Sequence, residues 1–124
     1  MKSSSLLALA VAAAALAAGA ASAAPVKYDI DPNHTYPSFS ADHMGGLSKW
    51  RGKINSSSGT ITLDTAAKTG TVEVKMNMST IDFGHEKMNE HAKNADIFDV
   101  AKFPEATYTG KLVNFKNGAP TEVD

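Results

Sequence analysis

The chain has 124 residues, with 12 Lys and Arg against 13 Asp and Glu, and no Cys, which indicates one small globular domain. The near-neutral charge argues against a nucleic-acid-binding protein, which needs a basic surface, and against a polybasic membrane-surface protein. The absence of Cys excludes a disulfide framework and thiol redox chemistry. Burial of apolar surface therefore has to stabilise the domain.

Residues 1–23 have the pattern of a secretory signal peptide. Lys2 precedes the apolar run 6–18, and Ala21-Ser22-Ala23 forms a small-residue cleavage site. The apolar run is too short to span a bilayer. We expect cleavage after Ala23, which leaves a mature domain of residues 24–124 with 11 basic and 13 acidic side chains.

The mature chain alternates apolar and polar residues with the period of two that is typical of half-buried strands. The clearest case is 71–79, where Val72, Val74, Met76 and Met78 alternate with polar residues. Similar alternation occurs at 26–30, 37–43, 50–54 and 60–64, and a further strand is predicted over 106–115. Turn-forming residues at 31–33, 45–46, 55–59, 66–70 and 116–118 separate the strands, which favours an antiparallel meander.

Two segments depart from this pattern. Residues 85–95 carry Met88, Ala92 and Ala95 at helical spacing, which predicts a short helix over one end of the sheet. Asn117-Gly118 is a hairpin signal, but only six residues follow it. Because natural sheets avoid long unpaired edges, this pattern indicates a fragment of a larger β-barrel that lacks two or more strands.

The histidine spacing does not support a metal site. His85-Glu86 resembles the start of a zincin helix, but Asn89 occupies the position of the second histidine. His91 would lie about 240° around a helix from His85. The four histidines, His34, His43, His85 and His91, are therefore interpreted as structural or surface groups, and no metal ligand is assigned.

His43 shares a strand face with Phe39 and Ala41. A buried histidine bonded to the backbone is favoured over a polar anchor for the head of an apolar ligand. Asp82 lies between a strand and the helix, where a carboxylate commonly accepts from free backbone N–H groups, so loop bracing is favoured over catalysis. Neither a nucleophile elbow nor a phosphate loop is present, and no catalytic residue is assigned.

The strongest candidate site is a large apolar set on the inward strand faces. These residues are Tyr28, Phe39, Trp50, Ile54, Ile61, Leu63, Val72, Val74, Met76, Met78 and Tyr108. Methionine side chains adapt to irregular shapes. An eight-stranded barrel can either fill its interior with such residues or hold one small ligand, and the pattern alone favours a filled core.

One string of residues is more specific. It comprises Ser79-Thr80-Ile81-Asp82, Glu86-Lys87, Glu90-His91, 95–100 (ADIFDV), Lys102-Phe103-Pro104 and Thr107-Tyr108. Earlier segments agree in order and spacing: Asp31-Pro32, His34, Phe39-Ser40, His43-Met44-Gly45, Ser48-Lys49, Arg51-Gly52-Lys53 and 58–64 (SGTITLD). The whole mature chain closely resembles the YceI-like family of lipocalin-like, polyisoprenoid-binding proteins.

The resemblance implies an all-β, lipocalin-like antiparallel barrel, with eight strands in the family and about six represented here, and one short helix near 85–95. It also implies a periplasmic protein whose interior holds an isoprenoid tail such as that of a quinone, with no other cofactor. Met88-Asn89 stands where many members have an Arg-Asp pair, so a polar network at the helix is expected to differ.

The leading hypothesis is a non-enzymatic periplasmic binder or carrier of an isoprenoid or similar long-chain lipid. Its ligand-binding residues would be Tyr28, Phe39, His43, Trp50, Ile61, Leu63, Val72, Val74, Met76, Met78 and Tyr108, with His43 at the ligand head. The alternative is a ligand-free, stress-related periplasmic protein that acts through protein contacts. An enzyme that uses His43, His85 or His91 ranks last, and homodimer formation stays open.

Overall fold

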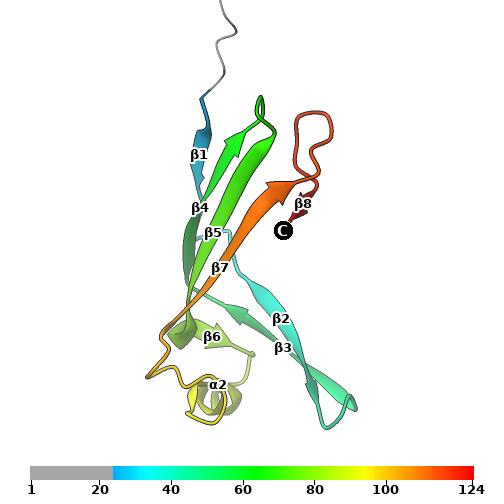
Figure 1. The fold of residues 1–124 in the computed structure, drawn as a ribbon. Coiled ribbons are helices and arrows are strands. Elements are labelled where there is room, and N and C mark those ends of the chain that lie inside the picture. The colour runs from blue at the N-terminus through cyan, green and yellow to red at the C-terminus, as the bar shows by residue number, and fades with distance from the viewer. Residues whose placement is uncertain (1–23) are drawn as a thin grey trace, which may run out of the picture.

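The computed structural model describes residues 24–124, so the predicted signal peptide and its cleavage site lie outside the described residues. The chain is an all-β antiparallel protein with one short α-helix (Figure 1). Its strands are β1 (Val26–Asp29), β2 (Ser38–His43), β3 (Ser48–Ile54), β4 (Ser57–Asp64), β5 (Thr69–Asn77), β6 (Ile81–Asp82), β7 (Glu105–Val113) and β8 (Glu122–Val123). Five of the six strands of four or more residues are those that the alternation predicts, and β7 is the further strand predicted over 106–115.

Five strands form one sheet in the order β1-β4-β5-β7-β8, with all neighbours antiparallel. Along β5 the side chains alternate between half-buried and exposed, as the apolar-polar period requires. Val72 lies opposite Ile61 on β4 and Gly110 on β7. Since directly opposed residues share a face of the sheet, this register gathers the apolar residues of several strands on one side.

The other sheet has three strands in the order β2-β3-β6. β3 continues into β4 through Asn55 and Ser56, so one chain segment connects the two sheets. The β2–β3 ribbon then diverges from the five-stranded sheet, and the described residues form an open, lipocalin-like arrangement without a closed barrel (Figure 1).

The buried core lies where the two sheets and the helix meet. It contains Ile54 at the end of β3, Ile81 in β6 and Ala92 in α2 (Glu86–Lys93). Four half-buried residues pack against these three: Phe39, Met76, Met78 and Phe83. We call this group the junction core. It fixes α2 and the 3-10 helix η1 (Met78–Thr80) below the larger sheet.

Several boundaries differ from the sequence predictions. The predicted break at 55–59 is too long, because Ser57 pairs with Met76 and its buried hydroxyl donates to the Thr35 carbonyl at 2.9 Å. The helix is shorter than 85–95, since it begins after His85 and ends before Asn94, which leaves Ala95 exposed outside it. None of the helices within residues 24–124 is long and apolar enough to cross a membrane.

Candidate functional site

The inner face of the five-stranded sheet carries most of the predicted ligand-binding residues. Tyr28 lies opposite Ile61, which lies opposite Val72, and Val74 lies opposite Tyr108. Leu63 lies opposite Val26 on the same face. Tyr28 and Tyr108 are 51% and 48% exposed, although they share this face with aliphatic side chains. The described residues therefore leave a wide apolar surface uncovered.

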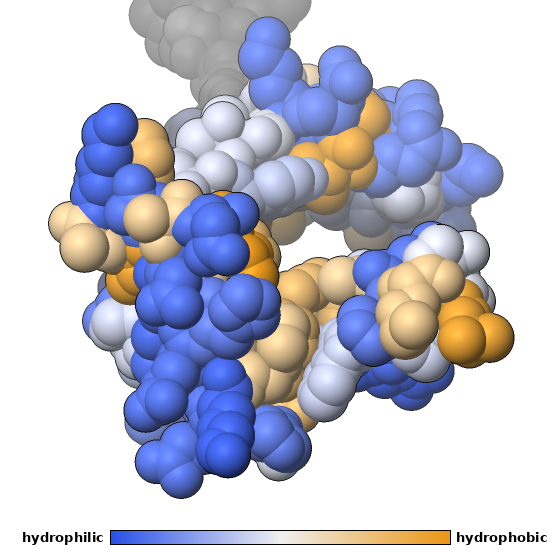
Figure 2. All heavy atoms as spheres, turned by 90° about the horizontal axis from the view of Figure 1, so that it is seen from below, coloured by the Kyte–Doolittle hydropathy of each residue, from blue (hydrophilic) through white to orange (hydrophobic). Residues whose placement is uncertain are grey.

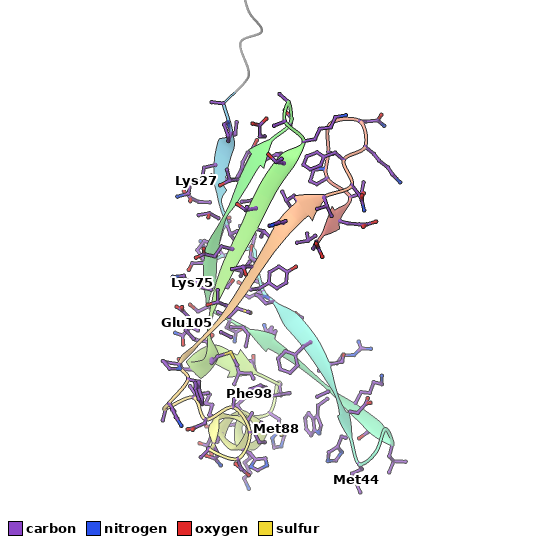
Figure 3. All side chains as sticks on the ribbon, viewed as in Figure 1. Lys27, Met44, Lys75, Met88, Phe98 and Glu105 are labelled. Atoms are coloured by element: carbon purple, nitrogen blue, oxygen red, sulfur yellow. The ribbon has the colours of Figure 1, made fainter. Side chains whose placement is uncertain are left out.

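This surface faces a hollow between the two sheets. Figure 2 shows the molecule from the end that carries α2, with apolar side chains on the walls of a central hollow and hydrophilic side chains around the outside. Figure 3 shows Lys27, Lys75 and Glu105 pointing away on the outer face of the large sheet. A separate groove of about 560 Å³ lies beside the β4–β5 turn, where the outer-face residues Thr62, Thr71 and Lys111 are part of its lining.

At the lower end of the hollow, aromatic rings come together from four segments. Phe39 on β2 lies edge-to-face with Phe83 at 5.5 Å and with Phe98 at 6.3 Å between ring centroids. Trp50 on β3 contacts Phe83 in the same way at 6.2 Å. We call Phe39, Trp50, Phe83 and Phe98 the aromatic cluster. Edge-to-face contacts of this kind hold rings in defined orientations, so the cluster forms a shaped apolar end to the hollow.

Two imidazoles flank the indole of this cluster. His43 lies 6.3 Å and His85 6.2 Å from Trp50 between ring centroids. The prediction that His43 is buried is wrong, because its side chain is exposed and its Nδ1 lies 3.0 Å from the Ser48 hydroxyl. The physical reason is that His43 is the last residue of β2 and lies beside the β2–β3 turn, where Met44 and Leu47 are also exposed.

The predicted apolar set divides between the two parts of the molecule. Phe39, Ile54, Met76 and Met78 belong to the junction core, and Trp50 lies in the aromatic cluster. The others line the inner face: Tyr28, Ile61, Leu63, Val72, Val74 and Tyr108. Phe83 and Phe98 were not among the predicted site residues, because neither belongs to an alternating segment. The helix-capping role of His85, whose Nδ1 accepts from the Met88 N–H at 3.3 Å, was not predicted either.

Asp82 braces the loop that positions the aromatic cluster. Its Oδ1 accepts from the Gly84 N–H at 2.8 Å and from the Asn89 amide at 3.1 Å, and its Oδ2 accepts from the Asn55 amide at 3.3 Å. These hydrogen bonds, led by that from Gly84, hold the pKa of Asp82 below its ordinary value. Bracing is therefore confirmed.

Asn89 completes this network from α2. Its side-chain oxygen accepts from the Phe83 N–H at 2.7 Å, and its amide donates to Asp82. An asparagine can make both bonds because it carries an acceptor and a donor on one group. The amide thus ties Phe83, and with it the aromatic cluster, to the helix.

The polar groups along the hollow do not form a metal-binding array. Within residues 24–124, no group of three or more His, Asp or Glu side chains lies close enough to hold a metal ion. His34 lies apart, in the loop after β1, where its Nδ1 contacts the Asp31 carboxylate at 2.6 Å. This contact and the Asn33 N–H hold the pKa of Asp31 below its ordinary value. The chemistry of the hollow is that of apolar contact with few polar groups.

Comparison with known proteins agrees with the sequence resemblance. The family model for the YceI-like domain matches residues 28–124. The chain belongs to the YceI-like family. Protein YceI of Escherichia coli O157:H7 is 32% identical over 120 residues, which cover 96% of this chain and 62% of that protein.

A second YceI protein gives a similar result. Protein YceI of Salmonella paratyphi B is 32% identical over 110 residues, which cover 88% of this chain and 57% of that protein. The chain spans less than two thirds of the length of these curated YceI relatives.

Proposed function

We propose that this protein binds a long-chain isoprenoid or a similar lipid in the periplasm, and that it is a binding or carrier protein without catalytic activity. The observation that carries the proposal is the uncovered inner face, on which Tyr28 and Tyr108 remain about half exposed. Contiguous exposed apolar surface marks a binding site in most soluble proteins. Membership of the YceI-like family supports an isoprenoid as the ligand, with a quinone as one member of that class.

A hydrocarbon chain can bind to this face with few polar contacts. Each buried methylene contributes about 0.8 kcal/mol, so a long hydrocarbon chain against this face gains affinity mainly from its length. Val72, Val74 and Tyr108 would contact the chain, and Trp50, whose ring lies 6.3 Å from that of His43, would contact the part of the chain next to the head. His43 would contact the head, because Nδ1 faces Ser48 and Nε2 stays available to a ligand.

The test is organic extraction and mass spectrometry of the protein isolated from the periplasmic fraction. We expect recovery in that fraction and a near-stoichiometric isoprenoid. A folded protein with no lipid would contradict the proposal and favour a role through protein contacts. Recovery only from the cytoplasmic fraction would contradict the localisation.

A matched pair of variants tests which face holds the ligand. Val74→Asp places a charge on the inner face, and Thr71→Asp places the same charge on the outer face of the same strand. We expect Val74→Asp to lose the lipid but to keep the β-strand signal in circular dichroism. We expect Thr71→Asp to keep both the lipid and the strand signal. Equal lipid content in two folded variants would contradict the inner-face assignment.

A further inference from the structure

A groove of about 770 Å³ with both polar and aromatic lining residues lies along the small sheet, beside β2, β3 and the loop after β6. Its polar lining comes from Ser38, Ser40, Arg51, Lys53 and Asp82. Ser40 lies opposite Arg51, and Ser38 lies opposite Lys53, which in turn lies opposite Asp82. Because opposed residues share a face, these side chains point to the same side of the ribbon, and Phe39, Phe83 and the two glycines Gly52 and Gly84 complete the lining.

Lys49, Arg51 and Lys53 lie on this side of β3 and differ in the groups that their positive charges contact. Lys49 lies 3.5 Å from the Asp42 carboxylate, and the Lys53 ammonium lies 5.2 Å from the centroid of the Tyr36 ring. Arg51, between them, makes no ion pair with any residue of the described part of the chain. It is also the only arginine in the sequence, and it lies in the groove.

The one carboxylate in the groove does not neutralise Arg51. Both oxygens of Asp82 already accept hydrogen bonds, from Gly84, Asn89 and Asn55. The lining contains two positive side chains, Arg51 and Lys53, and one negative side chain, Asp82, so its net charge is +1. The Ser38 hydroxyl donates to the Tyr36 carbonyl. The Ser40 hydroxyl makes no hydrogen bond within residues 24–124 and is therefore a further donor in the groove.

We propose that this groove binds a phosphate group. The Arg51 guanidinium donates two N–H hydrogen bonds to the phosphate, and Lys53 and the Ser40 hydroxyl contact its remaining oxygens. Arginine is suited to this role because its planar fork matches the oxygens of a phosphate. The proposal does not depend on lipid binding at the inner face of the large sheet, because none of the inner-face residues lines this groove.

The single arginine makes the test direct. Isotope-labelled protein has one arginine side-chain Nε–H resonance, and that resonance reports Arg51. We expect inorganic phosphate to shift it along a saturable curve at constant ionic strength, with sodium chloride as the comparison salt. Lys53→Gln and Ser40→Ala should each weaken phosphate binding. Arg51→Gln should weaken it by about tenfold or more. Because this variant lacks the arginine resonance, its binding is followed by the backbone amide resonances of Ser40 and Gly84.

Lys49→Gln is the matched control, because Lys49 lies on the same side of β3 but pairs with Asp42 outside the groove. It should leave phosphate binding unchanged. A linear, unsaturated shift, or one that sodium chloride reproduces, would overturn the proposal. Equal weakening by Lys49→Gln and Lys53→Gln would overturn it as well, since binding would then follow net charge rather than the groove.

Vesicles distinguish the two sources of a phosphate group. Co-sedimentation with vesicles of phosphatidylglycerol and phosphatidylcholine, lost in Arg51→Gln, would assign the groove to a lipid headgroup. Saturable phosphate binding without co-sedimentation would assign it to free phosphate or a soluble phosphate ester. Co-sedimentation that Arg51→Gln leaves intact would overturn a role of the groove at membranes.

Discussion

The junction core and the inner face contain similar apolar side chains but bury them to different extents. Ile54 and Ile81 in the junction core are 3% and 2% exposed, whereas Tyr28 on the inner face is 51% exposed. The large sheet is held together by long antiparallel ladders between β4, β5 and β7, so its side chains are not all needed for cohesion. Side-chain packing fixes the two sheets together, while much of the inner face stays exposed.

The difference between the junction core and the inner face is tested most directly by replacing an isoleucine in each. Ile54→Ala in the junction core should lower the free energy of unfolding by about 3 kcal/mol, because it removes fully buried methyl groups and leaves a cavity. Ile61→Ala on the inner face should cost about 1 kcal/mol, since its side chain is only half-buried. Urea unfolding of both variants measures the difference, and equal losses would show that the inner face is packed in solution.

The next test addresses the backbone ladder of the large sheet. Gly59 on β4 lies so close to β5 that an added Cβ would meet the Glu73 carbonyl oxygen and lie 2.9 Å from the Val74 Cα. Gly59→Ala should therefore separate the strands locally and cost about 1–3 kcal/mol. Ser58→Ala, at an exposed neighbouring position, is the control and should change the stability little. A neutral Gly59→Ala would contradict the close approach of the two strands.

A third test uses pH to isolate the loop brace at the aromatic cluster. The pKa of Asp82 is lowered by its hydrogen bonds, so its contribution to stability is present above about pH 4 and is lost as the pH falls through the lowered value. In Asp82→Asn the free energy of unfolding should depend less steeply on acid pH. Asp31, whose pKa is lowered in the loop after β1, contributes over the same window.

Asp31→Asn therefore serves as the comparison for Asp82→Asn. The double variant should show a shallower acid dependence than either single variant, because the two sites are separate and each loses its own contribution. Only Asp82→Asn should also change the emission of Trp50, which contacts Phe83 in the braced loop. An unchanged acid slope in Asp82→Asn would contradict the role of its hydrogen bonds.

The parts of the fold that follow a repeating pattern could be predicted from the sequence. The alternation of Val72, Val74, Met76 and Met78 identified β5, and the position of Asp82 between strand and helix identified its bracing role. Asn117 and Gly118 both adopt positive φ, as the hairpin signal requires. In each case a local rule determines the local structure.

The assembly of the site depends on contacts that no local rule contains. β6 has only two residues, and its partners lie in β3, so its sequence carries no alternation. Phe83 reaches the aromatic cluster because Asn89 holds its main chain, and Phe98 comes from an irregular segment after the helix. His43 was predicted to be buried on the strength of its strand face, but burial also requires a neighbouring element to cover that face.

The smallest expected effect concerns the start of α2, where His85 connects the helix to the aromatic cluster. Its Nδ1 accepts from the Met88 N–H, and its ring contacts Trp50. His85→Ala should cost about 1 kcal/mol, because a helix N-terminal donor loses its acceptor. His85→Asp should recover this loss, since a carboxylate also caps a helix N-terminus, but it should not restore the Trp50 emission of the parent. Chemical unfolding followed by the fluorescence of Trp50, the single tryptophan, measures both the free energy of unfolding and the emission of the folded state. Recovery of stability without recovery of emission would separate the capping role of His85 from its contact with Trp50, whereas full stability in His85→Ala would show that the helix begins without its aid.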